Sequence, residues 1–586
     1  MIYYLKKSTP SSKGEYLQIY ENHYDYETKK KITKSFKKLG YVCDLISDDM
    51  PDPVAYYKKY VEEMNKELKQ KEEPQIGTTS STKNLGYFLL KAMFDRLGMD
   101  NVLNIMNNNF KCKYKFSDML RNLCYTQVIN PGSKLKAFER VMPNIYGIES
   151  FSYDQILDAV KWIGADYHKY IELLNRAIEI NWGRNKDKVY FDCTNYYFEI
   201  DFETEFQRKG PSKENQKTPL IGQGLLLDAD QIPLDTVFYP GNQSEKPLIR
   251  ERIEAMKSTN NITGRVIQVA DKGLNCARNI YAAVVEANDG YIFSKSLRGT
   301  SLSEDKRKNA IREDDKLHQW VRVTNELGEL LYKYKVLKHI GIDNNIKNYC
   351  YYKYKCNVDG KDIEFTVKEK RIVTYNPKLA RKQKEEILKE VEKLRNLVSY
   401  KEAIHQELGN KSKYLIVEAK DKDGIKIKIA KGIDEDKVNE DLKYAGYNMI
   451  VTSEIDENPE HIYNTYHNLW RIEESFRIMK TYLEARPVFL SNEYSIYGHF
   501  TICYISLTLM RLLQFKVFKE QLTIDELFSF IRQYSVTNYK GNDYINSSTA
   551  DGVYKKINEI LGYSKLGNLY LNKHDLDLLL NIELDI

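Results

Sequence analysis

Apolar and polar residues change their spacing several times along this chain, and each change predicts a different kind of element. Residues 15–42 alternate around a polar turn, and a period of two predicts paired β-strands. The charged stretch 52–73 predicts a helix, and PQIGTTSSTKN (74–84) has the composition of a linker. From 85 to 182 the apolar spacing is close to 3.6, which predicts a helical region interrupted by INPGSK (129–134).

Short apolar runs appear after residue 187 and predict strands. These runs are KVYFDCTNYYFEID (188–201), LIGQGLLLDADQIPLDTVFYPGN (220–242), RVIQVADKGLN (265–275) and GYIFSKSL (290–297). A helical stretch, KPLIRERIEAMKS, separates the second run from the third. Strands separated by a helix favour a mixed α/β sheet.

The next region, 298–446, alternates again and carries many charges, which predicts a β-rich segment around one charged helix at 377–396. The strand YNMIVTS (447–453) follows, and helical spacing continues to the end of the chain. No run of 18 apolar residues occurs. The best candidate, HFTICYISLTLMRLLQF (499–515), contains Thr, Ser and Arg and favours a buried helix over a membrane span.

The length of 586 residues exceeds what one hydrophobic core supports, so we expect several folded regions. The pattern predicts a small β unit with a charged helix (1–75), a helical region (76–184), a first α/β part (185–297), a β-rich insertion (298–446), a second α/β part (447–515) and a C-terminal helical region (516–586).

The charge is close to balanced, with 89 Lys and Arg against 83 Asp and Glu and a net charge of +6. Three clusters set Lys beside aromatic residues: KCKYK (111–115), RKGPSKENQK (208–217) and YYKYK (351–355). Lys neutralises phosphates and Tyr stacks on bases, so the clusters are compatible with nucleic-acid binding. A solvated surface in a Lys- and Tyr-rich chain has the same composition, and both interpretations stay open.

The eight cysteines form no CxxC pair, which argues against a structural zinc site. The N-terminal stretch MIYYLKKSTPSSKGEY has no long apolar run and no cleavage pattern. We therefore expect no export, no membrane partner, and a cytoplasmic, nucleoid-associated location.

Two acidic residues close predicted strands: Asp192 ends VYFD and Asp271 ends VIQVAD. Asp is a poor strand residue, and in α/β sheets functional sites form where strands end. An Asp that starts a turn or caps a helix gives the same pattern. The two positions alone therefore leave both interpretations open.

A third acid lies in the helical stretch YHNLWRIEESFRIMK (466–480). Tyr466, Glu473 and Lys480 stand seven residues apart, so on one helix they share a stripe, with each step rising about 10 Å. A solvated helix face also looks like this. If the three acids converge, their oxygens suit two Mg²⁺ ions about 4 Å apart, as phosphodiester hydrolysis requires. Spacing cannot show convergence.

The stretch 466–480 resembles the Tyr-Arg-Glu-Lys signature of DDE transposases from prokaryotic insertion sequences, of the IS-four superfamily. YFDCTNYYFE is similar to the segment that carries the first catalytic Asp, and VADKGLN to the segment of the second. GLLLDADQIPLDTVFYPGN resembles the hairpin between them, and EARPVF and GHFTICYISL also match. The resemblance covers roughly residues 120–515 and keeps the motif order.

The resemblance implies an α/β fold in which a mostly β insertion domain interrupts an RNase H-like catalytic core. Helical N- and C-terminal regions and the small N-terminal β unit would flank it. The 201 residues between Asp271 and Glu473 leave room for the insertion. The resemblance also implies that Asp192, Asp271 and Glu473 are the catalytic residues and hold two Mg²⁺ ions, for which Mn²⁺ can substitute.

The same resemblance implies DNA contacts, with Tyr466 on the DNA end and Lys480 on the phosphate backbone. Leu469 stands where the signature has Arg, so Arg471 and Arg477 are the nearest replacements. We expect a secondary contact from Lys213. In relatives that form DNA hairpins a Trp of the insertion stacks on a flipped base, which makes Trp320 a candidate, with a core Trp as the alternative.

The function implied is transposition: hydrolysis of phosphodiesters at the element ends, then joining of the 3′-hydroxyl to target DNA. The expected partners are duplex DNA with terminal inverted repeats, target DNA and a second copy of the chain, because two ends must be joined. The helical region and the N-terminal unit are expected to bind the repeats, since a nuclease core reads few bases.

Two alternatives stay open: an RNase H-like nuclease without strand transfer, and a domesticated or inactive transposase that only binds DNA. A sugar hydrolase also uses paired carboxylates, but the order of the motifs gives it no support.

Overall fold

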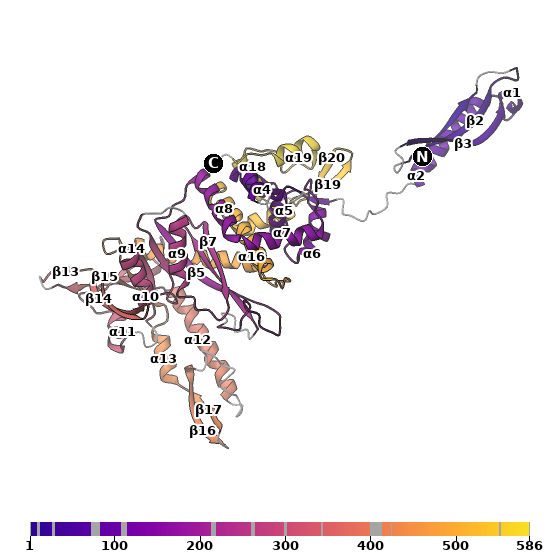
Figure 1. Cartoon of the computed structure of the whole chain (residues 1–586). Coiled ribbons are helices and arrows are strands. Elements are labelled where there is room, and N and C mark those ends of the chain that lie inside the picture. Colours follow the sequence, from indigo (N-terminus) through magenta and orange to yellow (C-terminus); the bar gives the residue numbers. More distant parts are fainter. Residues whose placement is uncertain are drawn as a thin grey trace. The chain divides into compact units, whose positions relative to one another are not determined.

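The computed structural model describes most of the chain and divides it into two compact units, Met1–Ser81 and Thr82–Ile586 (Figure 1). The described residues are 2–8, 12–25, 30–71, 82–106, 114–211, 218–259, 264–297, 302–341, 344–398, 413–422, 425–549 and 552–584. Lys213 and residues 111–113 of the first Lys cluster lie outside them.

The first unit is an antiparallel sheet followed by helices. Its described elements are β1 (Ile2–Lys7), β2 (Tyr16–Asp25), β3 (Lys30–Tyr41), α1 (Val42–Leu45) and α2 (Pro53–Lys71). The strands pair in the order β1-β2-β3, and the alternating pattern of 15–42 corresponds to β2 and β3. Leu17 and Ile19 on β2 and Val61 on α2 are buried.

The second unit is built on a sheet that has ten strands among the described residues, which confirms a mixed α/β fold. Its first five strands are β5 (Lys188–Tyr197), β6 (Leu220–Leu227), β7 (Pro233–Pro240), β8 (Ile267–Ala270) and β9 (Gly290–Lys295). They lie in the order β7-β6-β5-β8-β9. β5, β6 and β7 are antiparallel neighbours, whereas β8 and β9 run parallel to β5.

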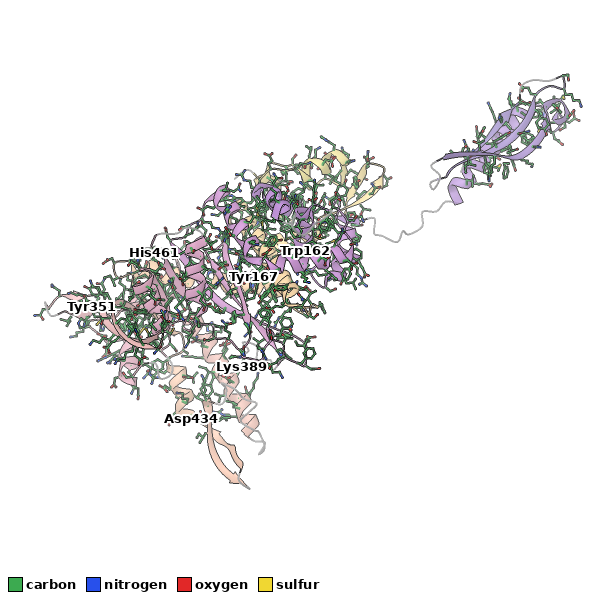
Figure 2. The ribbon with its side chains drawn as sticks, viewed as in Figure 1. Trp162, Tyr167, Tyr351, Lys389, Asp434 and His461 are labelled. Atoms are coloured by element: carbon green, nitrogen blue, oxygen red, sulfur yellow. The ribbon has the colours of Figure 1, made fainter. Side chains whose placement is uncertain are left out.

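The β-rich region 298–446 continues this same sheet beyond β9. The next strands are β18 (Tyr447–Thr452), β15 (Lys361–Tyr375), β11 (Leu330–Val336) and β10 (Val321–Thr324), each antiparallel to its neighbour, and β14 (Cys350–Val358) pairs with the outer part of β15. Tyr351 marks β14 in Figure 2. The region 298–446 therefore shares a sheet with the strands that precede and follow it.

The remaining elements of this region are short strands and helices. They are α11 (Glu304–Ile311), β12 (His339–Ile340), β13 (Ile346–Lys347), α12 (Pro377–Val398), the hairpin β16 (Leu415–Lys422) and β17 (Ile425–Ile433), and α13 (Glu435–Lys443). α12 is the charged helix expected at 377–396, and Lys389 marks it in Figure 2.

Alternate residues of β5 face two different layers, as the period of two requires. Phe191 and Cys193 pack with α9 (Leu248–Thr259) and α10 (Ala277–Tyr281), which is followed by the π-helix η4 (Ala282–Glu286). Tyr190 and Tyr196 pack on the other face with the helices that follow β18. Asp192 shares that second face.

A helical layer surrounds α16 (Glu493–Leu512), which continues into the π-helix η8 (Leu513–Val517). It comprises α3 (Phe88–Leu97), α4 (Asp100–Met106), α5 (Phe116–Ile129), α6 (Lys134–Lys136), η2 (Ala137–Val141), η3 (Met142–Asn144), α7 (Tyr153–Ala165) and α8 (Tyr167–Trp182). α7 and α16 cross at two glycines. A Cβ on Gly164 would lie 1.7 Å from the Tyr494 carbonyl oxygen, and one on Gly498 would lie 1.8 Å from that of Val160.

Within the described residues, one helical segment, Glu493–Val517, is long and apolar enough to span a membrane by length and composition. In this unit 94% of its apolar window is buried against other protein elements. This agrees with the buried helix expected at 499–515.

The C-terminal region is not wholly helical, contrary to the prediction. Its elements are α17 (Ile524–Gln533), β19 (Ser535–Lys540), β20 (Asp543–Asn546), α18 (Val553–Leu561), β21 (Tyr570–Asn572) and α19 (Lys573–Leu580). The hairpin of β19 and β20 was not predicted. Its strands, SVTNYK and DYIN, flank Gly541, whose φ of +60° permits the tight turn. β4 (Thr82–Asn84), from the end of the predicted linker, pairs with β19.

Candidate active site

The sheet places Asp192 and Asp271 side by side. β5 and β8 run parallel, and their last paired residues are Phe191 and Ala270. The next residue on each strand is the acid, and neighbouring strands lie about 4.8 Å apart. Residues that are 79 positions apart in the chain therefore meet where β8 ends.

Asp192 does not end its strand, contrary to the prediction. β5 continues to Tyr197 because β6 pairs with it over its whole second half, with Asp192 opposite Leu225. The strand that ends is the neighbour, β8. The Cys193 amide donates to Asp192 Oδ1 at 2.8 Å, so the carboxylate is held close to a rigid central strand.

Asp271 is oriented by two hydroxyl groups from different elements. Its Oδ1 accepts a hydrogen bond from Ser294 Oγ on β9 (2.8 Å) and one from Tyr466 Oη (3.1 Å). Burial, followed by the nearby Asp271 charge, raises the pKa of Tyr466 well above its usual value. Tyr466 therefore stays a neutral hydrogen-bond donor over the physiological pH range.

A cavity of about 350 Å³ connects Asp271 with the third acid. Its walls come from the end of β8, from β15 and the start of α12, and from the helices after β18. They include Asp271, Lys272, Thr374, Gln383, Tyr466 and Glu473. Asp271 and Glu473 thus face one cavity, and the exposed Lys272 supplies a cation at its wall.

The spacing of the motif 466–480 predicted one straight helix, but the structure breaks it. α14 (Pro459–His467) ends before Asn468, α15 (Trp470–Arg477) follows, and the π-helix η7 (Ile478–Tyr482) continues it. The turn between α14 and α15 contains i→i+3 bonds, such as Leu469 N to Tyr466 O (3.1 Å). The i→i+3 bonds tighten the chain between α14 and α15, and the π-helix η7 widens the helix further along. Residues seven positions apart therefore do not stay on one stripe.

Contacts at both helices fix Tyr466 and Glu473 against the sheet. His461 on α14, labelled in Figure 2, lies with its Nε2 2.9 Å from Lys188 Nζ at the start of β5. α15 packs on β5, with Ile472 and Phe476 buried in the shared core and Glu473 exposed. The exposed acid therefore lies on the helix that covers the Asp192 face of the sheet.

No group of three or more His, Cys, Asp and Glu side chains in the described part of the chain is arranged as a ready metal site. The three acids are thus brought to one region without forming a closed ligand cluster. Their donor set still fits the implied ion, because it consists of carboxylate oxygens only, which Mg²⁺ prefers.

The two arginines expected to replace the signature Arg both pair with Glu474. Arg471 Nη1 lies 3.4 Å from Glu474 and its Nη2 also pairs with Glu520, while Arg477 lies 3.5 Å from Glu474 on a more exposed side chain. The Arg471 guanidinium also stacks over the ring of Trp470, at 4.0 Å. Leu469 itself is buried and offers no cation.

Arg511 completes this network and was missed by the sequence reasoning. Its side chain is fully buried in α16 and donates to Glu474 Oε2 (2.9 Å), to Ser475 Oγ (3.0 Å) and to the Arg471 carbonyl (3.1 Å). A signal was present, because Arg511 is the charge that interrupts the apolar stretch 499–515. A buried charge requires a partner, and Glu474 supplies it.

The other predicted DNA contacts lie at separate places. Lys480 Nζ lies 5.4 Å from the ring centroid of Tyr196, four residues after Asp192 on β5. Trp320 donates its Nε1 hydrogen to the Arg312 carbonyl (3.1 Å), and Lys333 Nζ lies 4.6 Å from its ring. The Trp320 ring packs against the core cluster on the α9 side of the sheet, as a core Trp does.

No protein-family model matches this chain, and no curated protein matches it. Among solved structures, the synaptic complex of piggyBac transposase with hairpin DNA aligns at 10% sequence identity with a TM-score of 0.36. The alignment covers 86% of this chain and 85% of that one. A TM-score of this size does not establish a common fold, so no conclusion about this chain rests on it.

Proposed function

We propose that this protein is a metal-dependent DNA transposase of the DDE type. The observation that carries the proposal is the pairwise placement of three acids from distant parts of the chain. Asp192 and Asp271 are neighbours on parallel strands, and Asp271 shares a cavity with Glu473. The order of the motifs and their resemblance to DDE transposases support the same assignment.

The arrangement of elements supports an RNase H-like core. Such a core requires acids on neighbouring central strands and a third acid on a helix packed against them. β5, β8 and α15 supply these three positions. The region 298–446 would be the insertion between the second and third acids, joined to the core through β15 and β18.

Asp192, Asp271 and Glu473 would hold two Mg²⁺ ions, or Mn²⁺ in their place, through carboxylate oxygens. Bound there, the ions would lower the pKa of a water nucleophile and neutralise charge on the phosphodiester. Ser294 and Tyr466 orient Asp271 for this role through their hydroxyl groups. Lys272 at the cavity wall and Lys480 beyond it supply cations for DNA phosphates.

The reaction proposed is a nick at each element end, followed by attack of the freed 3′-hydroxyl on a target phosphodiester. The first step breaks a P–O bond with water as the nucleophile, and the second exchanges one phosphodiester for another. The substrates are duplex DNA with terminal inverted repeats and a target duplex. Two copies of the chain would be needed to hold two ends.

A second candidate function is sequence-specific DNA binding by an inactive transposase. One observation favours it: Leu469 is buried at the signature Arg position. The cleavage experiment below separates the two functions.

The test is cleavage of a labelled duplex that carries the inverted repeats flanking the gene, with an unlabelled target duplex present. The wild-type protein and Asp192→Asn are each assayed in Mg²⁺ and in EDTA. The control is Glu199→Gln, which changes an exposed acid just beyond β5. We expect a Mg²⁺-dependent nick at the repeat boundary and joined products, both lost in Asp192→Asn only.

Each other outcome decides between the alternatives. A nick without joined products would identify a nuclease that does not transfer strands. Specific binding without a nick, in Mg²⁺ and in Mn²⁺, would overturn the catalytic assignment and identify a DNA-binding protein.

A further inference from the structure

The N-terminal sheet has one covered face. Leu17 and Ile19 of β2 are fully buried, and Val61 of α2 is buried as well. Asn65 of α2 bonds both backbone groups of Tyr3, accepting from its N–H and donating to its carbonyl, each at 2.8 Å. These two bonds fix α2 to the edge strand β1, and the burial of Leu17 and Ile19 identifies the covered face of the sheet.

The opposite face of this sheet, which we call the open face, carries polar and aromatic side chains. Because side chains alternate, the residues that face away from Leu17 and Ile19 can be assigned from the pairing. Tyr4 lies opposite Tyr20, Lys6 opposite Gln18, Tyr20 opposite Ser35 and Gln18 opposite Lys38. None of these six side chains is buried, although Gln18 and Tyr20 belong to the central strand.

The open face carries positive charge with no acid among its six residues. Glu21, the acid of β2 nearest to these residues, has the same parity as Leu17 and Ile19 and therefore belongs to the covered face. The six residues of the open face include two Lys and no carboxylate. A face that carries Lys and no carboxylate is complementary to a polyanion.

The tyrosine rings of the open face favour a duplex over a single strand. Tyr4 and Tyr20 stack with ring centroids 5.9 Å apart, and Lys6 Nζ lies 4.9 Å from the Tyr20 centroid. The Tyr20 ring is thus occupied by its own neighbours, whereas single-strand binding needs free ring faces for bases. The phenol, amide and hydroxyl groups remain suited to base edges and phosphates.

The size of the open face also suits duplex DNA. Three strands about 4.8 Å apart span about 10 Å between the outer strands, and the major groove is about 12 Å wide. We propose that the open face of β1–β3 docks in the major groove of duplex DNA. The choice of DNA as partner rests on the proposed function, whereas the face and the groove come from this unit alone.

The test measures binding of a fluorescent duplex of random sequence to the full-length chain by anisotropy. EDTA is present throughout, so cleavage does not contribute. The variant is Lys6→Ala/Lys38→Ala, and the matched control is Lys58→Ala/Lys59→Ala, two exposed lysines of α2. We expect the open-face variant to weaken binding by about tenfold or more and to reduce the salt slope by about 2, with the control unchanged.

Several outcomes would overturn the inference: equal effects of the two variants, no effect of the open-face variant, or tighter binding of single-stranded DNA or of RNA of the same length. Absence of any duplex binding by the wild-type chain would overturn it as well. Circular dichroism of both variants checks that the unit remains folded. If cleavage succeeds while the open-face variant binds normally, this inference fails and the transposase assignment stands.

Discussion

The Tyr466 hydroxyl connects the helix side of the candidate site to its sheet side. It donates to Asp271 Oδ1 at 3.1 Å, and the sequence had suggested only a contact with the DNA end. A hydrogen bond to a charged group contributes about 1.5–3 kcal/mol. The residue's position therefore predicts a role in orienting Asp271.

Replacement of Tyr466 by Phe should lower the cleavage rate by about tenfold or more and leave DNA affinity unchanged, because only the hydroxyl is lost. Single-turnover cleavage and anisotropy measure the two quantities. Tyr494→Phe, at a half-exposed tyrosine, is the control. Weakened DNA binding with a normal cleavage rate would instead support the DNA-end contact.

His499 gives a prediction about pH. The ring is buried in α16 with Nε2 3.2 Å from the Ala485 carbonyl oxygen, and burial, followed by the nearby Lys134 charge, lowers its pKa to about 3. The unfolded chain takes up a proton near pH 6.5 and the folded protein does not. The free energy of unfolding should therefore fall as pH falls from about 6.5 towards 3, by at most about 1.4 kcal/mol per pH unit.

The measurement is the thermal unfolding midpoint between pH 7 and pH 5. The wild-type midpoint should decline more steeply than that of His499→Gln, which cannot take up the proton. Parallel curves for the two proteins would show that His499 does not contribute to the pH dependence.

At the scale of elements, the ion pair between Glu474 of α15 and Arg511 of α16 holds α15 in place on its buried side. Arg511 is fully buried and the Glu474 side chain is nearly so. Glu473, the adjacent residue, is exposed and points about 100° away around the same helix turn. The buried pair thus fixes the helix that presents the third acid.

Removing one partner of this pair leaves the other charge buried, so Arg511→Met or Glu474→Gln alone should lower the free energy of unfolding by about 3 kcal/mol. The double variant should cost less than the sum of the single variants. Thermal and urea unfolding measure this. Arg477→Met, which removes an exposed partner at 3.5 Å, should cost less than about 1 kcal/mol. Additive costs in the double variant would contradict the coupling.

Local elements could be predicted because their signals are local. The run VIQVA followed by Asp271 predicts both the strand β8 and the acid after it. The pairing of β18 with β9 could not be predicted, because register between strands distant in sequence depends on packing. The turn at Asn468 was also missed, since a few i→i+3 bonds leave no mark on the apolar pattern. The Glu474–Arg511 pair joins two helices, and single-sequence spacing does not link them.

At the scale of the whole molecule, the second unit assembles its candidate site from four separated segments. β5, the end of β8 and α15 bring the acids, and the start of α12 lines the cavity with Gln383. Gln383 Oε1 accepts from the Gly446 amide at 2.9 Å, which ties α12 to the strand β18 that follows. The region 298–446 therefore contributes a wall to the cavity that contains Asp271 and Glu473.

The central claim is that Asp192, Asp271 and Glu473 act as one catalytic unit. The most direct test is the single-turnover cleavage rate of the labelled repeat duplex by Asp192→Asn, Asp271→Asn, Glu473→Gln and the triple variant. Residues that act as a unit have non-additive effects, so each single variant should lose as much rate as the triple variant. A single variant that retains the wild-type rate, or losses that multiply from single to triple, would contradict the account.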